Sequence, residues 1–299
     1  MIQLTSLTKR YGDVVAVDDL TFTVRPGLVT GFLGPNGAGK TATMRMILGL
    51  DLPTSGSATI DGHPHRDLRD PLRVIGSLLD ARAVHPQRTA YKHLLYLAQS
   101  NSIPAVRVAE VLDLVGLSDV AGRKAGGFSL GMSQRLGIAA ALLGDPPVVV
   151  LDEPVNGLDP EGVRWIRALI RGLAAEGRTV LVSSHLMSEM AMTADRLVVI
   201  GKGRLVAEAA IDEFTEAGST VLVRTPEAAA LSRLLRLSGA HVQAGDEDEL
   251  LVTGMTAPDV GRLAAAEDVP LFELTQRRVS LEDAFMELTR DSVEYGAAR

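Results

Sequence analysis

The composition is that of a large, acidic chain without cysteine. It has 299 residues, of which 46% are hydrophobic, with a formal net charge of -7. Disulfides and thiolate metal sites are therefore excluded, the hydrophobic content is enough for more than one domain, and the acidic balance argues against a nucleic-acid partner. No apolar run reaches the roughly 18 residues of a membrane-spanning helix, and residues 1–10 lack a signal-peptide core, so we expect the chain to remain in the cytoplasm.

The first element expected is a strand over residues 15–24, where apolar and polar residues alternate. Tyr11 stands just before it, in the segment Thr8-Lys9-Arg10-Tyr11-Gly12. A flat aromatic ring at this place is able to stack on adenine. An isolated tyrosine packed at the edge of a sheet is the alternative, and the residues alone favour it.

A glycine-rich segment follows the apolar residues 28–33 and precedes a helical pattern over residues 41–50. It fits G-x-x-x-x-G-K-[ST] and comprises Gly34, Pro35, Asn36, Gly37, Ala38, Gly39, Lys40 and Thr41. Glycines let successive backbone N–H groups point inward at a helix N-terminus. This loop is therefore expected to bind the phosphates of a nucleotide, and a glycine-rich turn that binds no ligand is the alternative. Lys40 would add a cation at the β- and γ-phosphates, and the Thr41 hydroxyl would ligate Mg²⁺.

A largely helical insertion is expected between residues 82 and 143. Val108, Val111, Leu112 and Val115 have helical spacing and predict a stripe that faces a core. Near the end of the insertion, Ser129 and Gly131 are expected to open a helix that runs to about Leu143. Such a start offers a hydroxyl, backbone donors and a positive dipole end to an anion, although by itself it is only a capped helix.

Two further apolar runs end in polar side chains. Residues 147–151 precede Asp152 and Glu153, the pattern of a buried parallel strand that delivers carboxylates at its tip. Asp152 would hold Mg²⁺, and Glu153 would polarise the attacking water as general base. His185 follows the run over residues 179–182, where a neutral imidazole is able to hydrogen-bond the γ-phosphate. An ordinary surface acid pair and a structural histidine are the alternatives.

The segment Phe128-Ser129-Leu130-Gly131-Met132-Ser133-Gln134-Arg135 resembles the signature segment of ATP-binding cassette (ABC) ATPases. Other marks of that family stand at matching positions over the first two-thirds of the chain: Tyr11, Asn156-Gly157-Leu158-Asp159 and Ser183-Ser184-His185. The resemblance is to single-cassette subunits of drug and lantibiotic exporters that carry a small C-terminal module. It implies an α/β fold, a P-loop NTPase core of the ABC type with a helical lobe, and it implies ATP hydrolysis with Mg²⁺.

The resemblance also implies partners. Two copies would sandwich two nucleotides, with Ser129, Gly131 and Asp159 contributing to nucleotide binding, and the adenine-stacking role of Tyr11 depends mostly on this resemblance. The chain would power a separate membrane permease, for export, from the inner face of the cell membrane. The alternatives are a soluble ABC ATPase that acts on ribosomes or DNA and a GTPase switch. The first usually has two cassettes or long coiled coils and the second an Asn-Lys-x-Asp motif, none of which occurs here.

Some positions depart from the family pattern. Ala42 replaces the hydroxyl residue usually placed against the α-phosphate, and we expect weakened binding at most, because one neutral hydrogen bond contributes about 0.5 to 1.5 kcal/mol. Asp80 stands where a glutamine of the family usually contacts Mg²⁺ or water, so the resemblance implies a metal-binding role for it, with an added negative charge near the γ-phosphate. Leu130 replaces the first of the two usual glycines of the signature, and Met132 replaces its final glutamine.

The pattern of expected strands and helices changes near residues 214–219, which predicts a domain boundary, with the cassette over residues 1–215 and an accessory domain over residues 216–299. The expected order is βαββαβ, typical of a small ferredoxin-like α+β module, followed by an added helix over residues 281–290. No catalytic constellation occurs in it. Its expected role is stability or dimer contact, with regulation or permease docking as the alternative.

Overall fold

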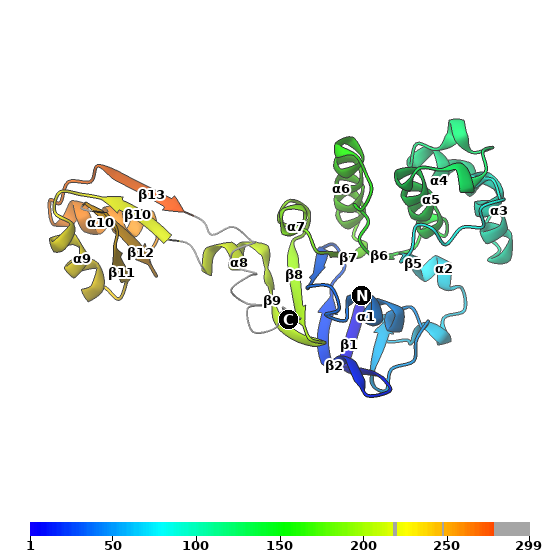
Figure 1. Ribbon diagram of the computed structural model, residues 1–299, viewed down its shortest axis with the longest axis horizontal. Helices are drawn as coiled ribbons and strands as arrows, with labels where there is room; N and C mark the ends of the chain where they lie inside the picture. The colour runs from blue at the N-terminus through cyan, green and yellow to red at the C-terminus, as the bar shows by residue number, and fades with distance from the viewer. Residues whose placement is uncertain (218–219, 247, 278–299) are drawn as a thin grey trace, which may run out of the picture. The chain divides into compact units, whose positions relative to one another are not determined.

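The computed structural model describes residues 1–217, 220–246 and 248–277 (Figure 1). The chain divides into two compact units, whose described residues are 1–209 and 210–277 apart from the gaps. The predicted boundary at residue 215 falls within α8 (Ile211–Ala217), the first element of the second unit. None of the described helices is long and apolar enough to cross a membrane.

The first unit is organised around a six-stranded sheet. Its order is β5 (Ile75–Leu78), β6 (Val148–Leu151), β7 (Thr179–Ser184), β3 (Val29–Leu33), β8 (Arg196–Gly201) and β9 (Arg204–Ala210). Neighbours from β5 to β8 pair in parallel, and every residue of β3, β6 and β7 is buried, as expected of a parallel sheet covered on both faces. The carboxyl ends of these three strands therefore meet at one edge.

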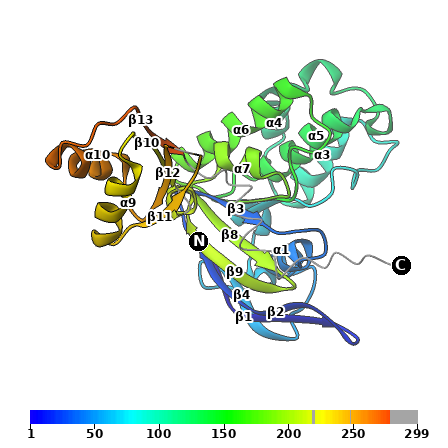
Figure 2. The same cartoon turned by 60° about the vertical axis from the view of Figure 1, so that its left-hand side comes forward.

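Helices cover both faces of this sheet. α6 (Pro160–Ala175) and α7 (Met187–Thr193) lie on one side and α1 (Lys40–Ile47) on the other (Figures 1 and 2). α1 begins directly at the end of the glycine-rich loop, so the predicted order of strand, loop and helix is present.

A second sheet was not anticipated from the sequence, which predicted a parallel core. Its antiparallel order is β2 (Val14–Val24), β1 (Ile2–Tyr11) and β4 (Ser55–Ile60). It packs with α1 and the parallel strands in one core, whose largest buried side chains include Ile2, Leu4, Leu20, Phe32 and Met44. This packing fixes where the first turn of α1 lies against both sheets.

The helical lobe is inserted between β5 and β6, as predicted. α2 (Pro71–Val74) precedes β5, and the lobe itself contains α3 (Ala90–Ser100), α4 (Val106–Leu114) and α5 (Leu130–Leu142). The predicted apolar stripe is confirmed, since its four members are buried: Val108, Val111, Leu112 and Val115.

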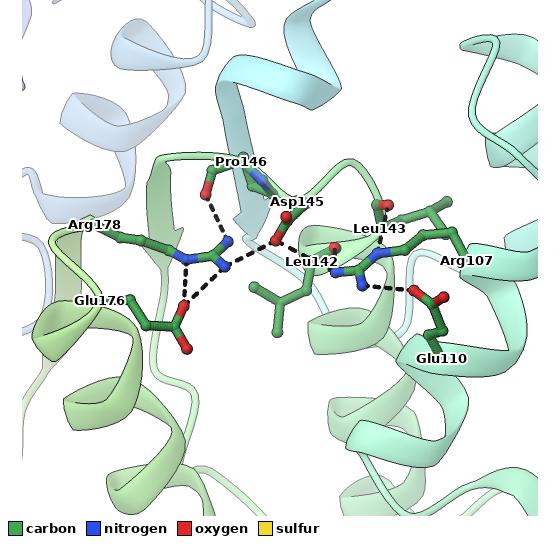
Figure 3. A network of polar contacts seen from close by, with 8 residues as sticks. All are labelled: Arg107, Glu110, Leu142, Leu143, Asp145, Pro146, Glu176 and Arg178. Atoms are coloured by element: carbon green, nitrogen blue, oxygen red, sulfur yellow. Dashed lines mark hydrogen bonds and ion pairs between the residues drawn. The ribbon is translucent and has the colours of Figure 1, made fainter.

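A polar network joins the lobe to the sheet (Figure 3). Asp145, between α5 and β6, pairs with Arg107 of α4 at 3.4 Å and with Arg178, just before β7, at 2.8 Å. Arg107 also donates to the carbonyl oxygens of Leu142 and Leu143 at the end of α5. One carboxylate therefore links a lobe helix to the amino end of a core strand.

The second unit is a small antiparallel sheet with helices. The strand order is β11 (His241–Ala244), β12 (Glu249–Thr253), β10 (Thr220–Arg224) and β13 (Glu273–Arg277). α9 (Ala228–Leu237) and α10 (Ala257–Ala266) pack on it through buried residues that include Val221, Leu231, Leu235, Val252 and Val260. The predicted strands and the first two helices are present, and the predicted helix over residues 281–290 lies outside the described residues.

Candidate functional site

The glycine-rich loop lines one side of an open cavity of about 350 Å³ at the carboxyl edge of the parallel sheet. Gly39 has φ +103, and a Cβ atom there would lie 2.4 Å from the carbonyl oxygen of Ala16. The loop therefore requires glycine at this position, both for its backbone conformation and for its close approach to β2. The cavity is lined by Ala16, Pro35, Asn36, Gly37, Gly39, Lys40, Thr41, Ala42, Asp152 and Glu153.

Lys40 is held against the loop from which it extends. Its side chain is buried, and Nζ donates to the carbonyl oxygens of Gly34 at 2.6 Å and Pro35 at 3.3 Å. Burial lowers the pKa of Lys40, while the charges of Glu153 and Asp152 act in the opposite direction. A partly desolvated cation interacts more strongly with a phosphate oxygen than a cation in water does, while the two neighbouring carboxylates offset part of its charge.

Thr41 and Asp152 come together although they are 111 positions apart in the sequence. Thr41 Oγ1 donates to Asp152 Oδ2 at 3.0 Å, and the hydroxyl of Ser183 donates to the other carboxylate oxygen. Mg²⁺ is usually bound by one or two such side-chain oxygens, completed by substrate phosphates and water. The donor set of Thr41 and Asp152 beside a phosphate loop therefore fits Mg²⁺.

Glu153 occupies a strained backbone conformation, with φ +49. Its N–H donates to Ser183 Oγ at 2.9 Å, and its Oε2 lies 2.8 Å from Nδ1 of His185. A left-handed residue other than glycine costs free energy and is common at functional sites. The structure thus brings the predicted base and the predicted histidine into direct contact at the edge of the cavity.

Ser183 is a site residue to which the sequence analysis gave no role of its own. It is fully buried on β7, next to β6, and contacts both predicted acids through one hydroxyl. Its position two residues before His185, at the end of an apolar strand, was the available signal. It orients Asp152 and the peptide of Glu153 together.

Ser129 and Asp159 cap their own helices. Ser129 Oγ accepts from the N–H of Met132 at 3.2 Å at the start of α5, and Asp159 Oδ1 accepts from the N–H of Gly162 at 2.8 Å at the start of α6. Gly131 lies beside the loop that precedes α6, because a Cβ atom at Gly131 would be 3.4 Å from the carbonyl oxygen of Gly157. Ser129, Gly131 and Asp159 are not among the residues that line the cavity.

Tyr11 and Asp80 also lie outside the lining of the cavity. The Tyr11 hydroxyl donates to Asp51 Oδ2 at 2.7 Å, while its side chain remains half exposed. Hydrogen bonds from Arg45 and Tyr11 lower the pKa of Asp51 to about 2. Asp80 accepts from the N–H of Arg82 at 2.8 Å and closes a turn after β5.

Comparison with known proteins supplies independent observations. A family model described as ABC transporter matches residues 17–156, and a second, described as a domain of unknown function, matches residues 219–282. The bacitracin transport ATP-binding protein BcrA of Bacillus licheniformis is 44% identical over 72% of this chain and 71% of its own length. The Nod factor export ATP-binding protein I of Burkholderia orbicola (strain AU 1054) is 36% identical over 96% of each chain.

A solved structure also matches a large part of this chain. The dimeric post-hydrolysis state of the ATP-binding cassette MJ0796, bound to ADP and Pi, superposes with a TM-score of 0.65 and 27% identity. The match covers 71% of this chain and 99% of that one.

Proposed function

Because this chain belongs to the ABC transporter ATP-binding proteins, we propose that it drives a separate membrane permease and that the transported compound, a drug, another small molecule or a peptide, is exported. It is an ATP-binding subunit with ATPase activity. The observation that supports the site assignment best is the convergence of Lys40, Thr41, Asp152 and Glu153 on one cavity, with His185 on Glu153. The transport and export named for the bacitracin and Nod factor relatives support the direction.

In the proposed reaction, the loop N–H groups and Lys40 bind the β- and γ-phosphates of ATP. Mg²⁺, held by Thr41 and Asp152, would neutralise phosphate charge. Glu153 accepts a proton from water as the water oxygen attacks the γ-phosphorus, and the bond to the β–γ bridging oxygen breaks to release ADP. His185 lies 2.8 Å from Glu153 and, as a neutral imidazole with one N–H, would donate that N–H either to the Glu153 carboxylate, which orients it, or to the γ-phosphate. Tyr11, held by Asp51, is proposed to stack on adenine.

We further propose that the complete site needs a second copy of the chain. Ser129, Gly131 and Asp159 lie outside the cavity of their own chain, which leaves the start of α5 available to the nucleotide of a partner. The dimeric state of the related cassette supports the same arrangement. Glu153→Gln should bind ATP without turnover and elute as a dimer in light-scattering chromatography with ATP and Mg²⁺. A variant that binds ATP and stays monomeric would overturn the sandwich.

The proposed location is the inner face of the cell membrane, in complex with the permease. Tagged protein purified from detergent-solubilised membranes should retain a multi-spanning protein that raises its ATPase rate. Lys40→Ala is the control, because it should retain the same partner without hydrolysis. Co-purification of ribosomal or DNA-repair proteins, without a membrane protein, would favour the soluble alternative.

For the second unit we propose a ferredoxin-like fold and a role in dimer contact. The order β10, α9, β11, β12, α10, β13, with β12 and β10 in the centre of the antiparallel sheet, supports this assignment. A chain shortened to residues 1–215, the proposed cassette, should bind ATP with parental affinity but dimerise more weakly. Unchanged dimerisation would contradict the proposed role.

A further inference from the structure

Gln134 connects α5, the helix that contains most of the signature segment, to the backbone of Glu153 through a hydrogen bond. It lies in the second turn of α5, where its side chain is buried, with 4% of its surface exposed. Its Nε2 donates to the carbonyl oxygen of Glu153 at 3.1 Å. A buried amide is costly unless it is hydrogen-bonded, so the pairing favours this one position of the Gln134 side chain.

The peptide groups on both sides of Glu153 are held. Its N–H donates to Ser183 Oγ, while its carbonyl oxygen accepts from Gln134 and, at 3.2 Å, from the N–H of Asn156. These contacts stabilise the left-handed conformation at φ +49, which an unconstrained glutamate would leave. The direction of the Glu153 side chain from this backbone therefore depends on them.

Contacts on either side of Gln134 fix the helix that carries it. Leu130 packs on Gly157, where a Cβ atom would come within 2.1 Å of Leu130 Cδ2. The guanidinium of Arg135 lies 4.2 Å from the ring centroid of Trp165 on α6. α5 is therefore seated on both the loop after Glu153 and the helix that follows it, and Gln134 is presented at a defined position.

We propose that Gln134 is a positioning residue for ATP hydrolysis, which holds the peptide of Glu153 in the conformation that aims its carboxylate at the attacking water. The inference rests on the proposed role of Glu153 as general base. Gln134 is not among the residues that line the cavity, so it acts through Glu153 and not by contact with nucleotide.

Gln134→Glu tests this directly, because it keeps the shape and replaces the amide donor by an acceptor that repels the carbonyl oxygen. We expect kcat to fall by about 10- to 100-fold, the range for a reacting group displaced by about 1 Å, with KM for ATP within about twofold of parental. Gln134→Met, of similar volume and without a donor, should show the same kcat loss and should fold, since Asn156 still bonds the carbonyl. The control is Gln99→Glu, the same change at an exposed position of α3. Parental kcat in folded Gln134→Met, or a rise in KM alone, would overturn the inference.

A double variant separates positioning from a general structural effect. If Gln134 acts only through Glu153, then Gln134→Met combined with Glu153→Gln should hydrolyse ATP no more slowly than Glu153→Gln alone. If the double variant instead loses activity by the product of the two single losses, Gln134 does not act through Glu153. If Glu153→Gln alone turns over at the parental rate, the general-base assignment fails. If it is inactive while both Gln134 variants are fully active, only the positioning role fails.

Discussion

Nδ1 of His185 lies 2.8 Å from Oε2 of Glu153. The two residues follow β7 and β6, which are parallel neighbours with Leu151 opposite Val182, so their side chains leave the sheet at the same edge. Both remain partly exposed, 44% for His185 and 21% for Glu153. The histidine is therefore placed to orient the carboxylate and still reach a ligand in the cavity.

His185→Ala should lower kcat by ~100-fold, because it removes the one imidazole N–H that would orient Glu153 or bond the γ-phosphate. ATP affinity should change little, since Lys40 and the loop N–H groups are untouched. Steady-state phosphate release measures the effect. His63→Ala, at an exposed turn, is the control and should be neutral. An unchanged kcat in His185→Ala would remove this residue from the mechanism.

Gly39→Ala should abolish ATP binding and destabilise the first unit by about 2 kcal/mol or more, because a Cβ atom at φ +103 would meet the Ala16 carbonyl oxygen at 2.4 Å. Calorimetric titration with ATP and urea unfolding measure the two effects. Gly172→Ala is the matched control, since that glycine lies within α6 with no atom near a new Cβ. It should leave binding intact and stabilise by about 0.5 to 1 kcal/mol. Normal ATP affinity in Gly39→Ala would contradict the conformation described for the loop.

Asp51→Asn should reveal a stability contribution that depends on pH. The native pKa of Asp51 is lowered to about 2 from its ordinary 3.8, so the charged form is stabilised by folding. This contribution is present above about pH 4 and is lost as the pH falls toward 2. Parental protein should therefore exceed the variant in free energy of unfolding at pH 7, with the gap closing on acidification. A gap that is constant or grows at low pH would show that the pairing with Arg45 and Tyr11 does not stabilise the charged carboxylate.

Asp145 allows charge and backbone effects to be separated in the network of Figure 3. It has φ +53, a conformation that asparagine tolerates better than alanine. Asp145→Asn should cost about 0.5 to 1 kcal/mol for the two partly exposed ion pairs, and Asp145→Ala about 1 kcal/mol more. Urea unfolding at low and high salt measures both. Equal losses of stability in the two variants would contradict a contribution from the backbone conformation. A loss in Asp145→Asn that does not change with salt would contradict a contribution from the ion pairs.

Much of the site was predictable because its groups occur in local patterns. The glycine-rich loop has to lie between a strand and a helix, and Asp152 and Glu153 follow a run of apolar residues that only a buried strand explains. These patterns are short-range, so they remain readable in one sequence. The same reasoning predicted the apolar stripe of buried residues in the helical lobe and the start of α5.

The parts that were missed depend on contacts between distant residues. The antiparallel sheet requires pairing of β1 with β4 across more than 40 intervening positions, and alternation alone does not indicate which strands pair. Ser183 and Gln134 contact Glu153 from 30 and 19 positions away, on a different strand and a different helix. Neither residue type is unusual in its own segment.

The sequence by itself determined which groups are available for the proposed reaction: phosphate donors, a hydroxyl and a carboxylate proposed to hold a cation, and a glutamate proposed to accept a proton. Tertiary structure alone decided how these groups are held, with Glu153 in a left-handed conformation between Ser183 and Gln134, and with Ser129 and Asp159 outside the cavity of their own chain. The reason is physical. Residue types set which interactions are possible, whereas strand register and helix packing set which atoms come within hydrogen-bonding distance.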